Sequence, residues 1–254
     1  MEELHGRVAV VTGAASGIGL AISEAFVAEG MRVVLADIDG TSLSEAVDRL
    51  SAEGAEVHGV VVDVSDSGSV DALGAAVIDC FGALHVAVNN AGIVNRGYSW
   101  ELPLEEWRRV LAVDLWGVIH GMHSFVPLLL ATGEEGHVVN VASLAAVDVH
   151  SRLGPYTVAK HGVLGLSDVL RAELTELAAP IGVSVVMPGR TATKMVPIGT
   201  NPPSVVADNV VDAIKSNRAY VYTDDESTAR VADRLMAIID ARADVITAHV
   251  PGGG

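Results

Sequence analysis

Basic residues and cysteine are scarce in this chain of 254 residues. Only 16 residues are Lys or Arg against 32 Asp or Glu, which leaves a formal net charge of −16. Such a surface repels phosphate backbones and anionic lipids, so we expect no nucleic acid and no membrane among the partners. The single cysteine, Cys80, excludes an internal disulfide and is typical of a reducing compartment.

Long hydrophobic runs and a secretion signal are also missing. No apolar run approaches the roughly 20 residues that a membrane-spanning helix needs. The segment 1–6 carries two acidic residues and no apolar core, so we expect a soluble, cytoplasmic protein without a signal peptide. Apolar residues are abundant, at 50%. That content suits one large domain over residues 1–254 and excludes disordered and disulfide-rich classes.

Short apolar runs alternate with segments of helical periodicity. Residues 43, 46, 47 and 50, all apolar, follow the i, i+3, i+4, i+7 spacing of an amphipathic helix. Apolar runs without polar alternation indicate strands buried on both faces. The alternation predicts an α/β fold, a parallel sheet with helices on both faces. The expected strands are 7–12, 33–36, 60–62, 84–88, 137–142, 182–187 and 220–223, with long helices at 104–131 and 155–178 and a lid-like loop at about 190–204.

A glycine-rich turn follows the first apolar run and precedes a helix. The glycines let the backbone approach a pyrophosphate, and the helix N-terminus offers unpaired N–H groups with a partial positive charge. A tight turn without a ligand is the alternative for such a stretch. The candidate cofactor-binding residues in this turn are Gly13, Ser16, Gly17, Ile18 and Gly19.

Asp37 ends the second apolar run, 18 residues after Gly19. A carboxylate at that place can accept hydrogen bonds from the adenosine ribose hydroxyls. It would also repel a 2′-phosphate, and the next residue, Ile38, carries no positive charge that could neutralise one. The pair of residues therefore favours NAD over NADP.

Four short motifs occur in a fixed order along the chain. They are T-G-x-x-x-G-x-G at 12–19, N-N-A-G at 89–92, Y-x-x-x-K at 156–160 and P-G at 188–189. Each motif is weak by itself, but together they resemble the short-chain dehydrogenase/reductase family over about residues 7–223. The resemblance implies a single-domain, Rossmann-like, doubly wound parallel sheet of about seven strands. It also implies oxidoreductase chemistry with a nicotinamide cofactor.

Tyr156 and Lys160 are four residues apart, so a helix would place them on one face. Free tyrosine has a pKa of about 10, and a neighbouring cation favours the phenolate that can take a proton from an alcohol. For these two residues alone, an ordinary surface pair is the alternative. The resemblance implies that Tyr156 is the general base and that Lys160 tunes it and binds the nicotinamide ribose.

Ser143 precedes Tyr156 by 13 residues and follows the fifth expected strand. The resemblance implies that its hydroxyl holds the substrate oxygen as charge moves onto it. A serine that merely caps a turn after a strand is the alternative.

Asp114 departs from the family pattern. The stretch Val113–Gly117 reads V-D-L-W-G, where the family usually has asparagine at the second position. In the family that asparagine supports a helix kink and a proton relay from the lysine to solvent. A carboxylate accepts hydrogen bonds as the amide oxygen would but cannot donate, and its charge would stabilise Lys160 if the two were close. We expect Asp114 to belong to the catalytic group as a relay residue, and the activity of Asp114→Asn tests whether the relay runs as it does with asparagine.

Further cofactor contacts are implied by matching position alone. Asp63 and Val64 would receive the adenine, and Asn90 and Gly92 would lie beside the adenosine half. No metal is expected, because His120 and His123 have no acidic or cysteine partner at ligand spacing. The remaining cofactor contacts that the resemblance implies are Pro188, Gly189, Thr191 and Thr193.

The leading hypothesis is an NAD-dependent dehydrogenase that interconverts a secondary alcohol and a ketone. The expected substrate lining is mostly apolar and favours an apolar substrate over a polyol. A 3-oxoacyl reductase is the nearest enzymatic alternative, disfavoured because the charge of −16 repels an acidic carrier protein. A non-catalytic NAD-binding protein that kept the fold is the other alternative. The expected lining comprises Leu144, Asp148, His150, Leu153, residues 94–100 and residues 195–198.

The expected helix at 155–178 is apolar on more than one face. One sheet covers only one face of a helix, so the second apolar face indicates a partner helix across a two-fold axis. We therefore expect a homo-oligomer, a dimer or a homotetramer.

Overall fold

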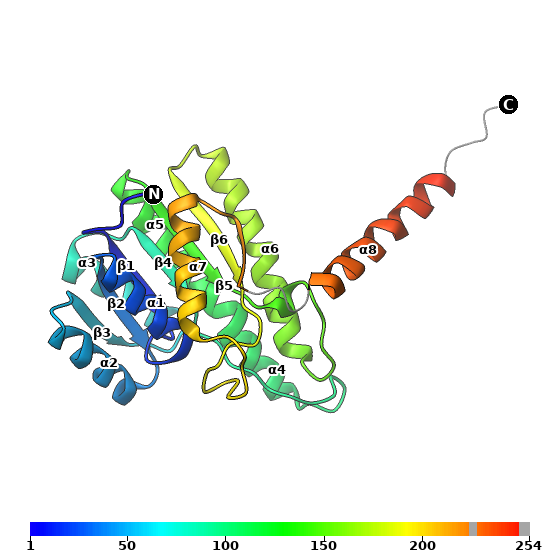
Figure 1. Ribbon diagram of the computed structural model, residues 1–254, viewed down its shortest axis with the longest axis horizontal. Coiled ribbons are helices and arrows are strands. Elements are labelled where there is room, and N and C mark those ends of the chain that lie inside the picture. The colour runs from blue at the N-terminus through cyan, green and yellow to red at the C-terminus, as the bar shows by residue number, and fades with distance from the viewer. Residues whose placement is uncertain (224–227, 249–254) are drawn as a thin grey trace.

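Seven parallel strands form one sheet in the order β3-β2-β1-β4-β5-β6-β7 (Figure 1). The computed structural model describes residues 1–223 and 228–248, with the backbone alone for 243–248. It confirms the predicted parallel sheet of about seven strands. The strands are β1 Val8–Thr12, β2 Arg32–Asp37, β3 Val57–Val61, β4 Val86–Asn89, β5 Gly136–Val141, β6 Ile181–Met187 and β7 Tyr220–Tyr222.

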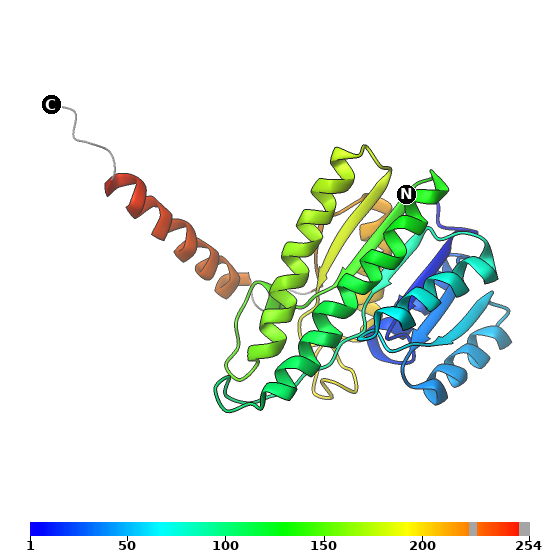
Figure 2. The same cartoon turned by 180° about the vertical axis from the view of Figure 1, so that it is seen from behind.

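Helices cover both faces of the sheet, as predicted. In Figure 1, α1 and α7 lie in front of the sheet, and Figure 2 shows α3, α5 and α6 across the opposite face. The α-helices are α1 Gly17–Ala28, α2 Gly40–Ala52, α3 Ser67–Phe81, α4 Leu104–Leu111, α5 Gly117–Thr132, α6 Gly154–Glu176, α7 Pro203–Ser216 and α8 Thr228–Ala248. Two short helices complete the list, the π-helix η1 Ala112–Trp116 and the 3₁₀-helix η2 Leu144–Ala146.

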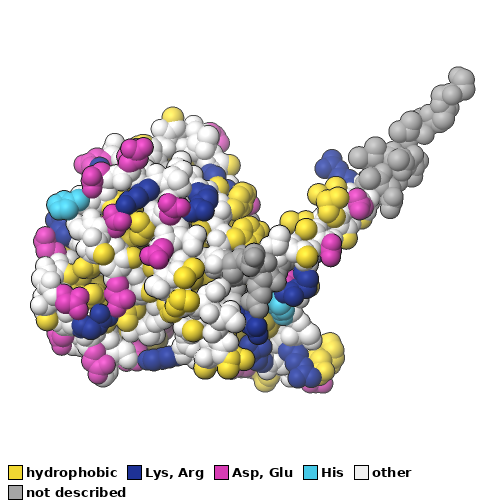
Figure 3. Space-filling view, in the orientation of Figure 1, with side chains coloured by type: hydrophobic (Ala, Val, Ile, Leu, Met, Phe, Trp, Pro, Cys, Tyr) yellow, Lys and Arg dark blue, Asp and Glu magenta, His cyan; other side chains and the backbone are white. Residues whose placement is uncertain are grey.

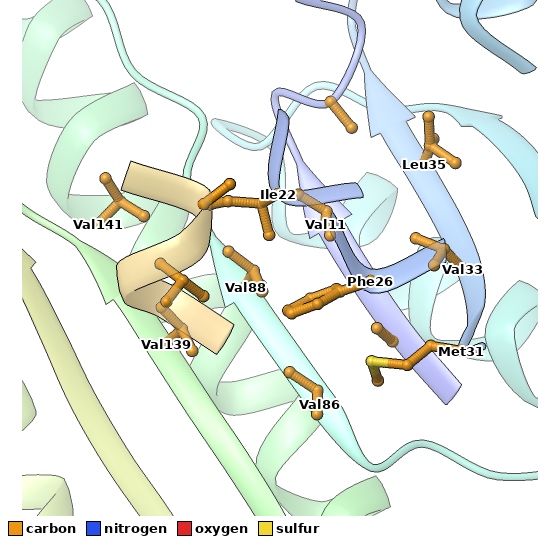
Figure 4. Close-up of a cluster of buried hydrophobic side chains, with 14 of the residues drawn as sticks. Val11, Ile22, Phe26, Met31, Val33, Leu35, Val86, Val88, Val139 and Val141 are labelled. Atoms are coloured by element: carbon orange, nitrogen blue, oxygen red, sulfur yellow. The ribbon is translucent and has the colours of Figure 1, made fainter. Parts of the chain in front are cut away.

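Strand β1 explains why the central strands read as uninterrupted apolar runs. Its side chains alternate between the two faces, so Val11 packs into the cluster under α1 and α7 while Val10 packs into the cluster under α3 and α5. Figure 4 shows Val11 beside Ile22 and Phe26 of α1 in the first of these clusters. A polar residue on either face of β1 would lose its hydration, so both faces must be apolar.

The expected helix at 104–131 is interrupted by the π-helix η1, with Asp114 at its centre. A single π-turn inside a longer helix frequently marks a functional site, because it redirects the side chains around it. By length and apolar composition alone, Leu104–Thr132 could cross a membrane. Phe125 and Leu129 of α5 are buried against α3 and the sheet.

Helices α7 and α8 were not expected from the sequence. The loop before α7 is tied by a bridge between Thr191 and Asn201, and Pro203 then opens the helix. Proline suits the first turn of a helix because the N–H it lacks has no partner there. Helix α8 follows the edge strand β7 and points away from the sheet (Figure 1).

Candidate active site

A cavity of about 600 Å³ opens where the strands end and their loops begin. The order β2-β1-β4 reverses the direction of winding at this point, which is where open α/β sheets form their ligand crevice. Eighteen sequence-predicted site residues are spread over Gly13 to Thr193, and the fold brings all but Gly19 to this one cavity. Those in the lining are Gly13, Ser16, Gly17, Ile18, Asp37, Asp63, Val64, Asn90, Gly92, Asp114, Ser143, Tyr156, Lys160, Pro188, Gly189, Thr191 and Thr193.

Gly19 is a packing residue beneath the glycine-rich loop and lies outside the cavity lining. A Cβ atom there would lie 2.2 Å from the backbone oxygen of Gly13, far inside van der Waals contact. The amide nitrogen of Asn90 fastens the same loop by donating to the backbone oxygens of Thr12, at 2.8 Å, and of Gly13, at 3.2 Å. The close approach of Gly13 by itself requires glycine at position 19, and the direct contact of Gly19 with a cofactor stays a prediction.

The first turn of α1 is open toward the cavity. Ser16 is the N-cap residue, but its side chain makes no capping hydrogen bond. Gly13 and Gly17 have φ angles of +66° and +58°, which other residues rarely adopt. The N–H groups at this helix end therefore remain available to an anionic group such as a pyrophosphate.

Asp37 is held at the cavity by two backbone hydrogen bonds. Its Oδ2 accepts from the Ala15 N–H and its Oδ1 accepts from the Asp39 N–H, both at 3.0 Å. The neighbouring Ile38 side chain also lines the cavity and is largely exposed. The carboxylate is therefore fixed in place next to an uncharged side chain.

Tyr156 and Lys160 project from the first two turns of α6. The Lys160 ammonium lies 5.6 Å from the centroid of the Tyr156 ring, so the two side chains share one face of the helix. Lys160 is buried and donates a hydrogen bond to the backbone oxygen of Val141, at 3.1 Å. This bond anchors the ammonium at the end of β5, between the tyrosine and the sheet.

Ser143 follows β5 and caps η2. Its Oγ accepts a hydrogen bond from the Ala145 N–H at 3.1 Å, so the capping role considered for this serine is present. Accepting that bond does not use the hydroxyl proton of Ser143. The side chain can therefore cap η2 and still donate to an oxygen in the cavity.

Asp114 is completely buried next to Lys160. Its Oδ1 accepts from the Ile93 N–H at 2.8 Å, and its Oδ2 lies 3.4 Å from the Lys160 ammonium. Oδ2 has no hydrogen-bond partner among the described residues. Burial raises the pKa of the Asp114 carboxyl, and the positive charge of Lys160 opposes that rise.

The substrate side of the cavity differs from the expected lining. Met195 and Val196 lie in the lining, whereas the other side chains expected there do not. Asp148 instead forms an ion pair with Arg230 of α8, whose guanidinium nitrogen lies 2.9 Å from Asp148 Oδ2. No local sequence pattern predicts this contact. Lining residues that sequence reasoning did not identify as site residues include Ser65, Ile93, Arg109 and Lys194.

Metal ligation has no support in the part of the chain that the structure describes. No three His, Cys, Asp or Glu residues are grouped there as ligands. His120 instead places its Nδ1 2.9 Å from the backbone oxygen of Val64.

Residues 7–200 match the model of the family described as short chain dehydrogenase. The chain belongs to this family. A curated relative, 1-deoxy-11-beta-hydroxypentalenate dehydrogenase of Streptomyces avermitilis, is 37% identical to this short-chain dehydrogenase over 244 residues. That similarity covers 91% of this chain and 90% of the relative.

Solved structures of short-chain dehydrogenases share the fold closely. A family member from Burkholderia phymatum, in complex with NAD, is 32% identical with a TM-score of 0.90, covering 100% of this chain and 99% of that one. A variant of actinorhodin polyketide ketoreductase with NADPH is 30% identical with a TM-score of 0.80, covering 87% of this chain and 97% of that one. Proteins of similar fold are therefore solved with either nicotinamide cofactor.

Proposed function

We propose that this short-chain dehydrogenase uses NAD(H) to interconvert an apolar secondary alcohol and the corresponding ketone. The observation that carries the proposal is the joint presence of Ser143, Tyr156 and Lys160 in the cavity that also holds Asp37 and the open end of α1. A base, its cationic neighbour and a hydroxyl donor are the groups that this reaction requires beside the nucleotide.

The cavity fits a dinucleotide. The uncapped first turn of α1 suits the pyrophosphate, and Asp37 offers acceptors to the adenosine ribose. Lys160 and Thr193 lie in the same lining and suit the nicotinamide half. When bound, NAD supplies the hydride acceptor for alcohol oxidation, and NADH supplies the hydride donor for ketone reduction.

The side chains of this protein accept the substrate proton and stabilise the charges that develop in the reaction. In the oxidation direction, Tyr156 takes the proton of the substrate hydroxyl. The Lys160 ammonium beside it favours the phenolate form of Tyr156 through its positive charge. Ser143 donates a hydrogen bond from its hydroxyl to the substrate oxygen, which stabilises the negative charge that develops on that atom.

The choice of NAD is argued from Asp37 and Ile38. Because structures of similar fold hold NAD or NADPH, the fold alone does not decide between them. A fixed carboxylate next to an uncharged side chain disfavours a 2′-phosphate by like-charge repulsion. Lys194 also lines the cavity, so removal of the Asp37 charge is the direct test of this argument.

The apolar substrate is argued from the remaining lining. Ile93, Val113, Met195 and Val196 bring aliphatic surface to the cavity. The name of the Streptomyces avermitilis relative specifies a hydroxypentalenate, which supports an alcohol on a largely hydrocarbon frame. The similarity to a polyketide ketoreductase keeps an acyl ketone as the second candidate, against which the charge of −16 argues when the acyl carrier is acidic.

The test is NADH formation from NAD over a panel of apolar secondary alcohols, polyols and 3-hydroxyacyl thioesters. Tyr156→Phe is the matched control, because it removes only the phenolic oxygen. We expect turnover with the apolar alcohols that Tyr156→Phe abolishes while NAD binding, followed by protein fluorescence, is retained. Preference for a polyol or an acyl thioester would overturn the substrate assignment. NAD binding without turnover on any substrate would favour the non-catalytic alternative.

A further inference from the structure

Helix α8 leaves the body of the protein and projects into solvent (Figures 1 and 2). Its described contacts with the rest of the chain come from its first two turns. Arg230 pairs with Asp148 at 2.9 Å, and Arg234 donates to the backbone oxygen of Val147 at 2.8 Å. A second nitrogen of Arg234 lies 3.0 Å from Nε2 of His161 on α6. The start of α8 is therefore held in one direction, and the rest of the helix extends beyond the body.

The projecting part of α8 carries an apolar stripe. Val231, Leu235, Ile238 and Ile239 follow the i, i+4, i+7, i+8 spacing of one helix face. Val231 is buried in the core cluster, whereas Leu235, Ile238 and Ile239 are exposed by 42%, 57% and 60%. Figure 3 shows hydrophobic side chains gathered along the described part of this helix.

A solitary helix of this kind needs a partner. Isolated helices are marginal in water, and most helices in proteins are stabilised by packing of an apolar face. The stripe begins at Val231 inside the core and continues outward without a covering element from the described part of this chain. Its exposed residues therefore mark a surface that another molecule covers.

We propose that a second copy of this chain covers the apolar stripe of α8, with each copy extending its α8 across the other. Helix α6 supports this occupant, because it exposes Val158 and Val169 on its outer side. One chain thus carries both a projecting arm, helix α8, with an exposed apolar stripe and an uncovered apolar surface on helix α6. A two-fold arrangement buries such surfaces reciprocally.

Charge argues against the other occupants of the stripe. Residues 228–248 contain three arginines and three aspartates, so the arm is neutral on a chain of net charge −16. Amphipathic helices that bind anionic membranes are usually rich in Lys and Arg on their polar face. A neutral arm adds no repulsion to the association of two acidic copies, whereas it gives no attraction to an anionic lipid surface.

The experiment compares two charge-matched double variants of the full chain by sedimentation velocity. The first, Leu235→Asp with Ile239→Asp, places two carboxylates in the stripe. The second, Ala229→Asp with Ala237→Asp, adds the same charge at exposed positions on the opposite face. We expect the first variant to sediment as a species of half the mass of the unmodified protein, and the second to retain the full mass. Equal masses for both variants, or a monomeric unmodified protein, would overturn the proposal.

Hydrogen exchange tests the same interface without any substitution. Backbone amides of α8 in the unmodified protein are expected to become more protected as the protein concentration rises across the association range. Protection that does not depend on concentration would contradict coverage by a second copy.

Flotation with vesicles of phosphatidylcholine and phosphatidylglycerol tests whether the stripe binds a membrane instead. Vesicle binding that the stripe variant loses and the control keeps would assign the stripe to a membrane and overturn the proposal.

Discussion

Asp114 and Lys160 form a buried ion pair, with Oδ2 of the carboxyl 3.4 Å from the ammonium nitrogen. The pair is held on both sides, because Asp114 accepts from the Ile93 N–H and Lys160 donates to the Val141 oxygen. An asparagine at position 114 could keep the first bond but would leave Lys160 without a neighbouring negative charge. The carboxylate therefore offsets part of the positive field that Lys160 exerts on Tyr156.

Asp114→Asn is expected to move the pH–rate profile of alcohol oxidation to lower pH, by on the order of one pH unit. The reason is that the full charge of Lys160 then favours the phenolate of Tyr156. The measurement is kcat/KM against pH for both proteins with the same alcohol. Asp114→Ala is the control. It removes the same negative charge as Asp114→Asn and, in addition, the acceptor of the Ile93 N–H. An unmoved profile in Asp114→Asn would show that the carboxylate does not act on the reacting tyrosine.

Asp37→Asn tests the choice of cofactor. The amide oxygen can still accept the hydrogen bond from Ala15 or from Asp39, but the negative charge is gone. We expect the ratio of kcat/KM with NAD to kcat/KM with NADP to fall by on the order of tenfold, and by on the order of 100-fold when Ile38→Arg is added. Comparable turnover of the unmodified protein with both cofactors would refute the role given to Asp37.

Ser143→Ala is expected to lower kcat by about 100- to 1,000-fold, the usual effect of losing one donor to a developing oxyanion. The substitution also removes the cap on the Ala145 N–H, so binding of NAD is measured in parallel to show that the cavity is intact. An unchanged dissociation constant for NAD with reduced turnover supports a catalytic role. Equal losses of binding and turnover would instead identify Ser143 as a capping residue alone.

His137 is expected to make the fold sensitive to acid. Burial lowers its pKa from 6.5 to about 3, assisted by the positive charges of the N-terminus and Arg171. Between these values the unfolded chain binds a proton that the folded chain excludes, so stability is lost as pH falls below about 6.5. Nε2 of His137 lies 2.8 Å from Ser184 Oγ, a hydroxyl that itself donates to the Arg218 oxygen. The folded histidine is therefore neutral, with its proton on Nε2.

His137→Gln removes this titration and keeps a donor that can reach Ser184. At about pH 7 the variant is expected to be the less stable protein, because its side chain does not match the buried site. Its deficit should shrink by about 2 kcal/mol between about pH 7 and about pH 5, as the unmodified protein loses the contribution of its neutral histidine. Urea unfolding at the two pH values measures both free energies. A deficit that is constant with pH would contradict the assignment.

The features predicted correctly from the sequence depend on neighbours along the chain. Residues 8–11 are apolar on both sides because they are buried in the middle of a sheet, and this pattern is readable without coordinates. The glycines at 13 and 17 are required by local backbone angles that other residues rarely adopt. The apolar periodicity of α7 and α8 was equally present in the sequence, but amphipathic spacing does not say whether a stripe faces the sheet, as in α7, or solvent, as in α8.

The sequence by itself thus determined the parallel α/β sheet, the glycine-rich turn and the position of Asp37 at a strand end, because these are properties of short segments. Only the tertiary structure decided that Asp114 faces Lys160 and that Arg230 pairs with Asp148, 82 residues away. It also decided that Gly19 packs against Gly13 and lies outside the cavity. Such contacts depend on how whole helices pack, and a distance of a few ångströms between side chains on different elements is set by that packing alone.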